Sequence, residues 1–211
     1  MKIGIVAFPS KHLQDLANNY RKRYDPHYAQ ITPHITLKDA FDVDEAKVKE
    51  ISDTLQKVSE TFGPLKIQTS RVSSFYPTTN TIFFKIEPTP QLENFQKVLQ
   101  QEIPYGAPKY FFVPHITIAQ KLSDSEHDDI FGQLRMTGVN VEETIDRIHL
   151  LYQLFIGALA SLGKSFVSRR GNLYIASPLL FERSTVSTIV VIPSLQPYCF
   201  NTSIVLSSCA P

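Results

Sequence analysis

Apolar and polar residues follow two distinct periods along the first 154 residues of this 211-residue chain. Segments in which apolar residues recur every three or four positions predict amphipathic helices, and alternating or β-branched segments predict strands. Strands are predicted over 2–8, 33–37, 65–73, 81–86, 110–119 and 144–152, and helices over 11–24, 48–62, 90–99 and 124–134. This mixture of helices and mainly antiparallel strands predicts an α+β fold.

Capping signals support the predicted helix starts. Ser10 offers an N-cap hydroxyl, Thr89 precedes a proline at the first helical position, and Ser123 with Glu126 forms a capping-box pattern. Residues 42–45 resemble a capping pair before the second helix. In the first helix the apolar residues share one face, and Arg21 takes another face together with the neighbouring basic residues.

The order strand–helix–strand–helix–strand occurs twice, which indicates an internal duplication. Equivalent strands begin 78 positions apart (3 and 81) and 79 positions apart (65 and 144). We therefore expect one domain over 1–154, with pseudo-repeats over about 1–75 and 80–154. Two such units predict a duplicated bilobal fold, in which two mainly antiparallel sheets with outer helices enclose a central cleft.

One short phrase appears in both units, as Pro33-His34-Ile35-Thr36-Leu37 and, 81 positions later, as Pro114-His115-Ile116-Thr117-Ile118. In a strand, successive side chains point to opposite faces, so each histidine shares a face with its threonine while the aliphatic residues face the core. The imidazole and the hydroxyl then lie roughly 7 Å apart along the strand, close enough for both to contact one phosphate group.

The motif suits acid–base attack on a phosphodiester. One imidazole can accept a proton from the nucleophile while the other, held protonated, donates one to the leaving oxygen. Thr36 and Thr117 can donate hydrogen bonds to the non-bridging phosphate oxygens. The alternative is a duplicated structural strand, in which threonine reflects β-propensity alone and each buried imidazole needs a hydrogen-bond partner.

Composition narrows the remaining classes. Twenty-one basic and twenty acidic residues leave a net charge of +1, so no strong overall field attracts nucleic acid. The two cysteines, Cys199 and Cys209, lack the spacing of a zinc site or a disulfide framework. No stretch reaches the roughly 18 apolar residues of a membrane span, and the first residues run directly into a strand pattern, so a cytoplasmic location without membrane contact is expected. The sequence carries no signal for an oligomeric state.

These two motifs resemble those of the 2H phosphoesterases, a family with two His-x-Thr/Ser-x motifs in a duplicated bilobal fold. The resemblance covers roughly residues 1–154, and Phe75, the segment 111–115 and the segment 146–152 look like its bacterial YjcG-like branch. Members of the wider family act on 2′,3′-cyclic phosphates, 2′-5′ RNA linkages or small cyclic nucleotides, and need no metal or cofactor. The resemblance thus implies a phosphoesterase acting on a nucleotide or RNA end, with His34 as proton donor and His115 as proton acceptor. A non-catalytic binder of RNA ends or nucleotides that uses the same cleft is the competing hypothesis.

Other polar residues are weaker candidates. His12 and His127 lie on predicted helices and His27 in a turn, which favours structural or solvated roles. His149 lies in the last predicted strand, from which it could turn toward the cleft. Lys38 shares the face of the first motif and either adds charge to the cleft or extends to solvent, while Ser73 and Ser74 end a strand near the cleft.

Residues 155–211 form an atypical C-terminal segment. They contain one acidic residue, Glu182, and ten serines, whereas nineteen of the twenty acids precede them. Only the run 186–192 is apolar enough for an edge strand or an aggregation-prone stretch. We interpret this segment as the product of a shifted reading frame or a replaced gene end, ill-ordered or sticky in character and without a part in the site. The alternative is a genuine lineage-specific tail that covers a sheet edge.

Overall fold

The structure is a computed structural model that describes residues 1–152, 165–169, 172–176 and 190–193. The elements run in the order β1 (Lys2–Ala7), α1 (Lys11–Tyr24), β2 (Ile35–Asp42), η1 (Glu45–Lys47), α2 (Val48–Thr61), β3 (Leu65–Ser74), β4 (Ile82–Ile86), α3 (Pro90–Glu102), β5 (His115–Ala119), α4 (Asp124–Leu134), β6 (Gly138–Ile145), β7 (Arg147–Tyr152), β8 (Ser165–Arg169), β9 (Asn172–Ala176) and β10 (Val190–Pro193). The predicted α+β class is confirmed.

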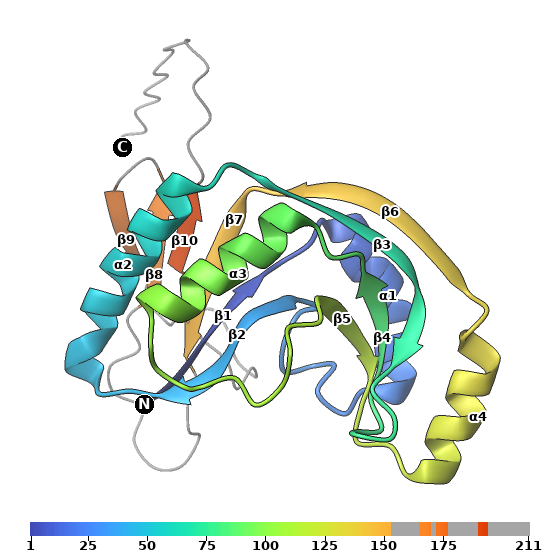
Figure 1. Cartoon of the computed structure of the whole chain (residues 1–211). Coiled ribbons are helices and arrows are strands. Elements are labelled where there is room, and N and C mark those ends of the chain that lie inside the picture. Colours follow the sequence, from blue (N-terminus) through green and yellow to red (C-terminus); the bar gives the residue numbers. More distant parts are fainter. Residues whose placement is uncertain (153–164, 170–171, 177–189, 194–211) are drawn as a thin grey trace, which may run out of the picture.

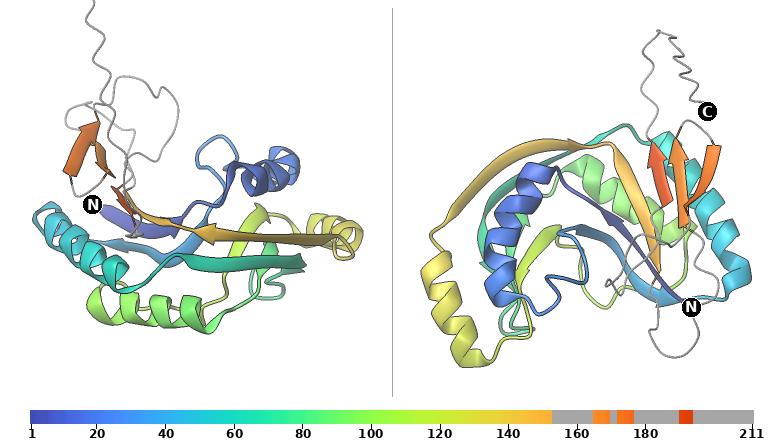
Figure 2. Two further views of the ribbon diagram at one scale, coloured as in Figure 1. Left: turned by 90° about the horizontal axis from the view of Figure 1, so that it is seen from above. Right: turned by 180° about the vertical axis from the view of Figure 1, so that it is seen from behind.

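Two antiparallel sheets form the centre of the molecule (Figure 1). The first sheet has the order β10-β7-β1-β2 and the second sheet has the order β5-β4-β3-β6, while β8 and β9 pair separately. Seen from above, α2 and α3 lie on one side of the strands and α1 lies on the other (Figure 2). The motif strands β2 and β5 are edge strands of their sheets, and they lie next to each other. The predicted pair of antiparallel sheets with outer helices is therefore confirmed.

The two sheets do not coincide with the two sequence units. Strand β3, which closes the first unit, pairs with β4 and β6 in the second sheet. Strand β7, which closes the second unit, pairs with β1 in the first sheet. Each sheet is thus completed by a strand from the other half of the chain.

Several element boundaries differ from the sequence prediction, and the first motif strand, predicted over 33–37, is Ile35–Asp42. The predicted strand 144–152 is two strands, β6 and β7, which belong to different sheets. Strand β6 begins at residue 138, and only two of its eight residues are buried, so the apolar signal of this strand is weak. The predicted strand 110–119 begins only at His115, and the residues before it include the almost fully exposed Phe111. Aromatic residues are common in strands, so Phe111 favoured a strand prediction although it is not part of a sheet.

The helix caps are confirmed with one exception. The side chains of Ser10 and Thr89 accept hydrogen bonds from Leu13 N and Leu92 N, and Ser123 and Glu126 form a complete capping box. The capping pair expected over 42–45 is wrong, because β2 extends to residue 42 and a 3-10 turn without a side-chain cap precedes α2.

The apolar residues of the helices and sheets form one continuous core. Its largest fully buried side chains include Phe84 on β4, Phe95 on α3 and Leu13 on α1. Because Ile35 and Leu37 of the first motif and Ile116 and Ile118 of the second are buried in this core, the alternate positions of both strands face away from it.

Beyond residue 154, the described residues are the three short strands β8, β9 and β10. Strand β10 lies at the edge of the first sheet, beside β7, which matches the edge-strand interpretation of the apolar run 186–192. The segment predicted to be ill-ordered over 155–211 thus contains three strands, and its other residues, including 186–189 of the apolar run, lie outside the described part.

Candidate active site

The two motifs meet at one cavity of about 470 Å³. His34, Thr36 and Thr117 line it, and thus both motif strands contribute to its wall. His115 lies close enough to His34 for its charge to lower the pKa of His34. The structure therefore places His34, Thr36 and Thr117 at one cavity, and it places His115 on the strand β5 that contacts β2.

Both motif histidines are anchored in the same way. His34 Nδ1 lies 2.8 Å from the carbonyl oxygen of Thr32, and His115 Nδ1 lies 2.6 Å from the carbonyl oxygen of Val113. Because a carbonyl oxygen can only accept, each Nδ1 carries a proton and donates it. The hydrogen bond leaves Nε2 of each ring as the atom available for proton exchange.

Aromatic rings pack around both imidazoles. Phe8 contacts the edge of His34 at 6.3 Å between ring centroids, and Phe75 and Phe83 contact His115 at 4.9 and 5.1 Å. Burial in these surroundings lowers the pKa of both histidines, because an imidazolium ion loses hydration there. The carbonyl contacts of the two Nδ1 atoms act in the opposite direction and raise each pKa.

The motif threonines occupy matched places in the two sheets. Thr36 stands opposite Val6 of β1, and Thr117 stands opposite Phe83 of β4. None of the hydrogen bonds found among the described residues involves either hydroxyl. Both side chains are half-buried and line the cavity, so their hydroxyls are available to a ligand.

Lys38 lines the same cavity but is only 2% exposed, which excludes the alternative that its side chain extends to solvent. Its ammonium group donates to the side-chain oxygen of Gln100 on α3 and lies 5.4 Å from the centroid of the Phe41 ring. Burial lowers the pKa of this lysine. Lys38 therefore links the motif strand to an outer helix.

Strands β7 and β3 place His149 and Ser73 at equivalent positions, each beside the strand that also pairs with a motif strand. His149 of β7 stands opposite Val6, and Ser73 of β3 stands opposite Phe83. His149 is 8% exposed, its ring centroid lies 4.8 Å from that of Phe8, and its Nδ1 has no hydrogen-bond partner among the described residues. Burial, with a smaller contribution from Arg147, lowers the pKa of His149 to about 4.

The remaining histidines have different surroundings. His127 is buried on α4, where its Nε2 lies 2.6 Å from the hydroxyl of Ser74 and its ring stacks against Tyr76 and Phe131. This contact fixes α4 to the end of β3, in keeping with the expected structural role. His12 is exposed.

A group of polar residues beside His34 was missed by the sequence analysis. Arg21 and Asp25 form a buried ion pair, and with His27 and Gln120 they line the cavity. The expected placement of Arg21 on a polar face of α1 is wrong, because Arg21 continues the buried row of Leu13 and Ala17 at four-residue spacing and is only 3% exposed. The signal that could have revealed this pair was the spacing of a base and an acid four positions apart at a helix end.

Within residues 1–152 and the three short strands, no three His, Cys, Asp or Glu side chains come together as metal ligands do. In the same part of the chain, every helix is too short or too polar to cross a membrane.

Comparison with known proteins assigns the family. Residues 8–154 match the family described as the 2′-5′ RNA ligase superfamily. A protein of Geobacillus sp. (strain WCH70) named "Putative phosphoesterase" is 50% identical over 158 residues, which are 75% of this chain and 91% of the relative. A Bacillus pumilus protein of the same name is 46% identical over 158 residues, which are 75% of this chain and 92% of the relative.

Solved structures show the same fold. Escherichia coli LigT complexed with 3′-AMP has a TM-score of 0.58 at 12% identity, over 90% of this chain and 97% of LigT. Another crystal structure, described as that of a phosphoesterase, has a TM-score of 0.59 at 12% identity, over 92% of this chain and 98% of that chain. The family match and the relatives named as phosphoesterases define the class as that of the 2H phosphoesterases, and the expected resemblance is confirmed. This chain belongs to the 2′-5′ RNA ligase superfamily, with relatives in Bacillus and Geobacillus.

Proposed function

We propose that this protein is a phosphoesterase that opens cyclic phosphodiesters on nucleotides or RNA ends by two-histidine acid–base catalysis, without a metal ion. The observation that carries the proposal is the matched anchoring of His34 and His115. Each Nδ1 donates to a backbone carbonyl, which leaves two Nε2 atoms for one acid and one base. The relatives' name "Putative phosphoesterase" agrees with this class.

In the proposed reaction, water attacks the phosphorus atom of a 2′,3′-cyclic phosphate. Neutral His115 accepts a proton from the water at Nε2 as the new P–O bond forms. The bond from phosphorus to one ribose oxygen breaks, and the Nε2–H of cationic His34 protonates that oxygen. The product is a phosphomonoester beside a free hydroxyl, and proton exchange with solvent restores both imidazoles. The assignment of His34 as acid and His115 as base follows the family pattern.

Thr36 and Thr117 are the proposed phosphate ligands. Their hydroxyls would donate to the two non-bridging oxygens, where negative charge increases in the transition state. Their matched positions on β2 and β5 support contacts from both sides of one phosphate group.

A nucleotide or the end of an RNA chain is the proposed substrate, and the cytoplasm is the proposed location. The cavity of about 470 Å³ falls within the range that small-molecule ligands occupy. LigT, which shares the fold, has been crystallised with 3′-AMP, NADP⁺ and ATP.

A non-catalytic protein that binds RNA ends or nucleotides in the same cleft is the second candidate. One observation favours it: burial lowers the pKa of both motif histidines, so a neutral solution leaves little of the cationic form that a proton donor needs. Two neutral imidazoles can bind a phosphate ester through hydrogen bonds without transferring protons.

A turnover assay separates the two candidates. The protein is incubated with 2′,3′-cyclic nucleotides and 2′-5′ linked oligonucleotides in excess chelator, and phosphomonoester formation is measured. We expect turnover, and we expect His34→Ala and His115→Ala each to reduce kcat by about 10²–10⁴-fold, as is usual for a general acid or base, with a small change in KM.

The exposed His12 provides the control, because His12→Ala removes an imidazole far less buried than the motif pair. Binding of the nucleotides without turnover would favour the non-catalytic candidate. Turnover that survives in both motif variants would refute the two-histidine mechanism, and turnover that chelator abolishes would refute its independence of metal.

A further inference from the structure

A buried ion pair stands where α1 ends, directly beside the first motif. Arg21 Nε donates to Asp25 Oδ2 at 2.7 Å, and the two side chains are 3% and 1% exposed. Ions lose their hydration when buried, and an apolar pair of similar volume often stabilises a fold as well or better. Packing alone therefore does not explain why this pair is buried.

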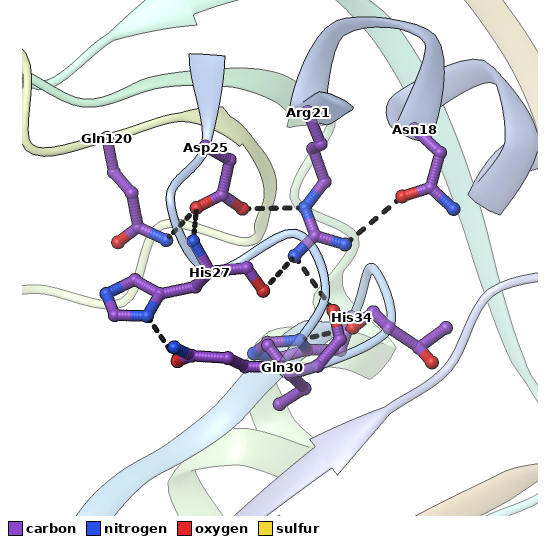
Figure 3. Close-up of polar contacts among 9 residues, drawn as sticks. Asn18, Arg21, Asp25, His27, Gln30, His34 and Gln120 are labelled. Carbon is purple, nitrogen blue, oxygen red and sulfur yellow. Dashed lines mark hydrogen bonds and ion pairs between the residues drawn. The ribbon is translucent and has the colours of Figure 1, made fainter. Parts of the chain in front are cut away.

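The guanidinium of Arg21 holds the loop that leads to His34. Its Nη2 donates to the carbonyl oxygens of Ile31 at 2.8 Å and His27 at 3.3 Å, and its Nη1 donates to Asn18 Oδ1 at 3.2 Å (Figure 3). The residue after Ile31 is Thr32, whose carbonyl oxygen accepts from His34 Nδ1. The guanidinium group of Arg21 thus fixes the backbone at Ile31, one residue before the carbonyl group that orients the imidazole of His34.

The carboxylate of Asp25 connects the same loop to the second motif. Its Oδ1 accepts from His27 N and from Gln120 Nε2, both at 2.9 Å (Figure 3). Gln120 directly follows β5, the strand of His115 and Thr117, and its backbone N donates to the carbonyl oxygen of Tyr24 at 3.3 Å. The network therefore joins the loop of one motif to the strand end of the other.

We propose that Arg21 and Asp25 are positioning residues, which hold His34 in its Nδ1–H tautomer and fix it relative to His115. The proposal concerns the site described above, and its catalytic consequence rests on the proposed phosphoesterase function. Neither residue is assigned a contact with the reacting atoms.

The charges around His34 predict in which direction its pKa changes when either member of the ion pair is removed. Arg21 lowers the pKa of His34 and Asp25 raises it, while His115 of the neighbouring strand also lowers it. His149 of β7 is separated from His34 by the ring of Phe8, which contacts both. Removing the cation should raise the pKa of His34, and removing the anion should lower it. A loss of packing alone would not reverse sign between the two variants.

The experiment is a pH titration of the full chain by ¹⁵N NMR of the histidine rings, which reports the pKa and the tautomer of each ring. Arg21→Met is expected to raise the pKa of His34, Asp25→Asn to lower it, and the double variant to return it toward the wild-type value. Arg21→Lys keeps the positive charge but lacks the separate N–H donors of the guanidinium group. The pKa of His34 should therefore stay nearly unchanged, while the share of its Nδ1–H tautomer falls.

Two controls accompany the titration. His115 is an internal reference, because its Nδ1 donates to Val113 in a different loop. The exposed pair Lys49–Asp53 on α2 has the same four-residue spacing, so Lys49→Met and Asp53→Asn should leave the His34 ring signals unchanged. If Arg21→Met or Asp25→Asn fails to fold, Arg21→Lys and the double variant still report the tautomer.

An unchanged tautomer of His34 in the folded variants would overturn the proposal, whatever the activity of the protein and even where the two charges shift the pKa of His34. Where cyclic-phosphate turnover is found, Arg21→Lys should lower kcat by ten- to a hundredfold with little change in KM, since a displacement of about 1 Å can cost 10²-fold. An expected NMR result in a protein without turnover would refute the phosphoesterase function and leave the positioning role intact. Full activity in Arg21→Lys would refute the catalytic consequence.

Discussion

Replacing His149 with phenylalanine should make the fold less sensitive to acid. The native ring is 8% exposed, and burial lowers its pKa to about 4 from the usual histidine pKa of 6.5. Between these values the unfolded chain binds a proton that the folded chain does not bind, so the free energy of unfolding falls as pH falls from 6.5 toward 4. At about 1.4 kcal/mol for each pKa unit, His149 alone removes about 2 kcal/mol of stability at pH 5.0.

Urea unfolding at pH 7.5 and pH 5.0 measures this contribution. His149→Phe keeps a ring beside Phe8 and removes the titrating group. The wild-type protein should lose about 2 kcal/mol more than the variant between the two pH values. The motif histidines remain in both proteins, so their contributions cancel in the comparison, and His12→Phe at an exposed site should retain the wild-type loss. An equal loss of stability in wild type and His149→Phe would refute the reasoning.

Three further predictions concern the site and the chain end. The kcat/KM profile should be bell-shaped with its maximum below pH 6.5, because burial lowers the pKa of both His34 and His115; a maximum above pH 7 would contradict this. Thr36→Val and Thr117→Val should each lower kcat/KM by about tenfold or more, in line with about 1.5–3 kcal/mol for a hydrogen bond to a charged group, and steady-state kinetics with unchanged circular dichroism would establish it. Translation of another reading frame of the coding DNA past codon 154 should continue the acid-rich pattern of the first 154 residues. A chain truncated after residue 154 should still fold and turn over substrate. Lack of such a frame would count against a shifted reading frame, and an inactive or unfolded truncation would show that the C-terminal segment belongs to the structure.

The central part of the site was predictable because it depends on local pattern. Alternation within a five-residue strand decides which side chains share a face, and Ile35 and Leu37 are buried while Thr36 lines the cavity. The repetition of the phrase then indicated that two such faces belong to one site. The prediction that both motif faces belong to one site needed only the two-residue alternation of a strand and the internal duplication.

The network beside the motifs depends on long-range contacts, which local pattern does not encode. Asp25 and Gln120 are 95 positions apart and meet only because α1 packs against β5. Arg21 follows Leu13 and Ala17 in the buried row of α1, and its charge is accommodated there because Asp25 and the carbonyl oxygens of the following loop accept its hydrogen bonds. The sheet to which β3 and β7 belong is likewise decided by pairing, and their own alternation is the same in either sheet.

The crossing of β3 and β7 between the sheets makes the two halves of the chain mutually dependent. A chain cut between β3 and β4 would leave a first fragment with β1 and β2 of one sheet and β3 of the other. A single ancestral unit could complete such a sheet only by exchanging its last strand with a second copy, as in a domain-swapped dimer. The present chain has the connectivity of that dimer with its two subunits fused. The chain passes between the two sheets twice, from β2 to β3 and from β6 to β7, so a hinge through a single linker cannot separate the sheets.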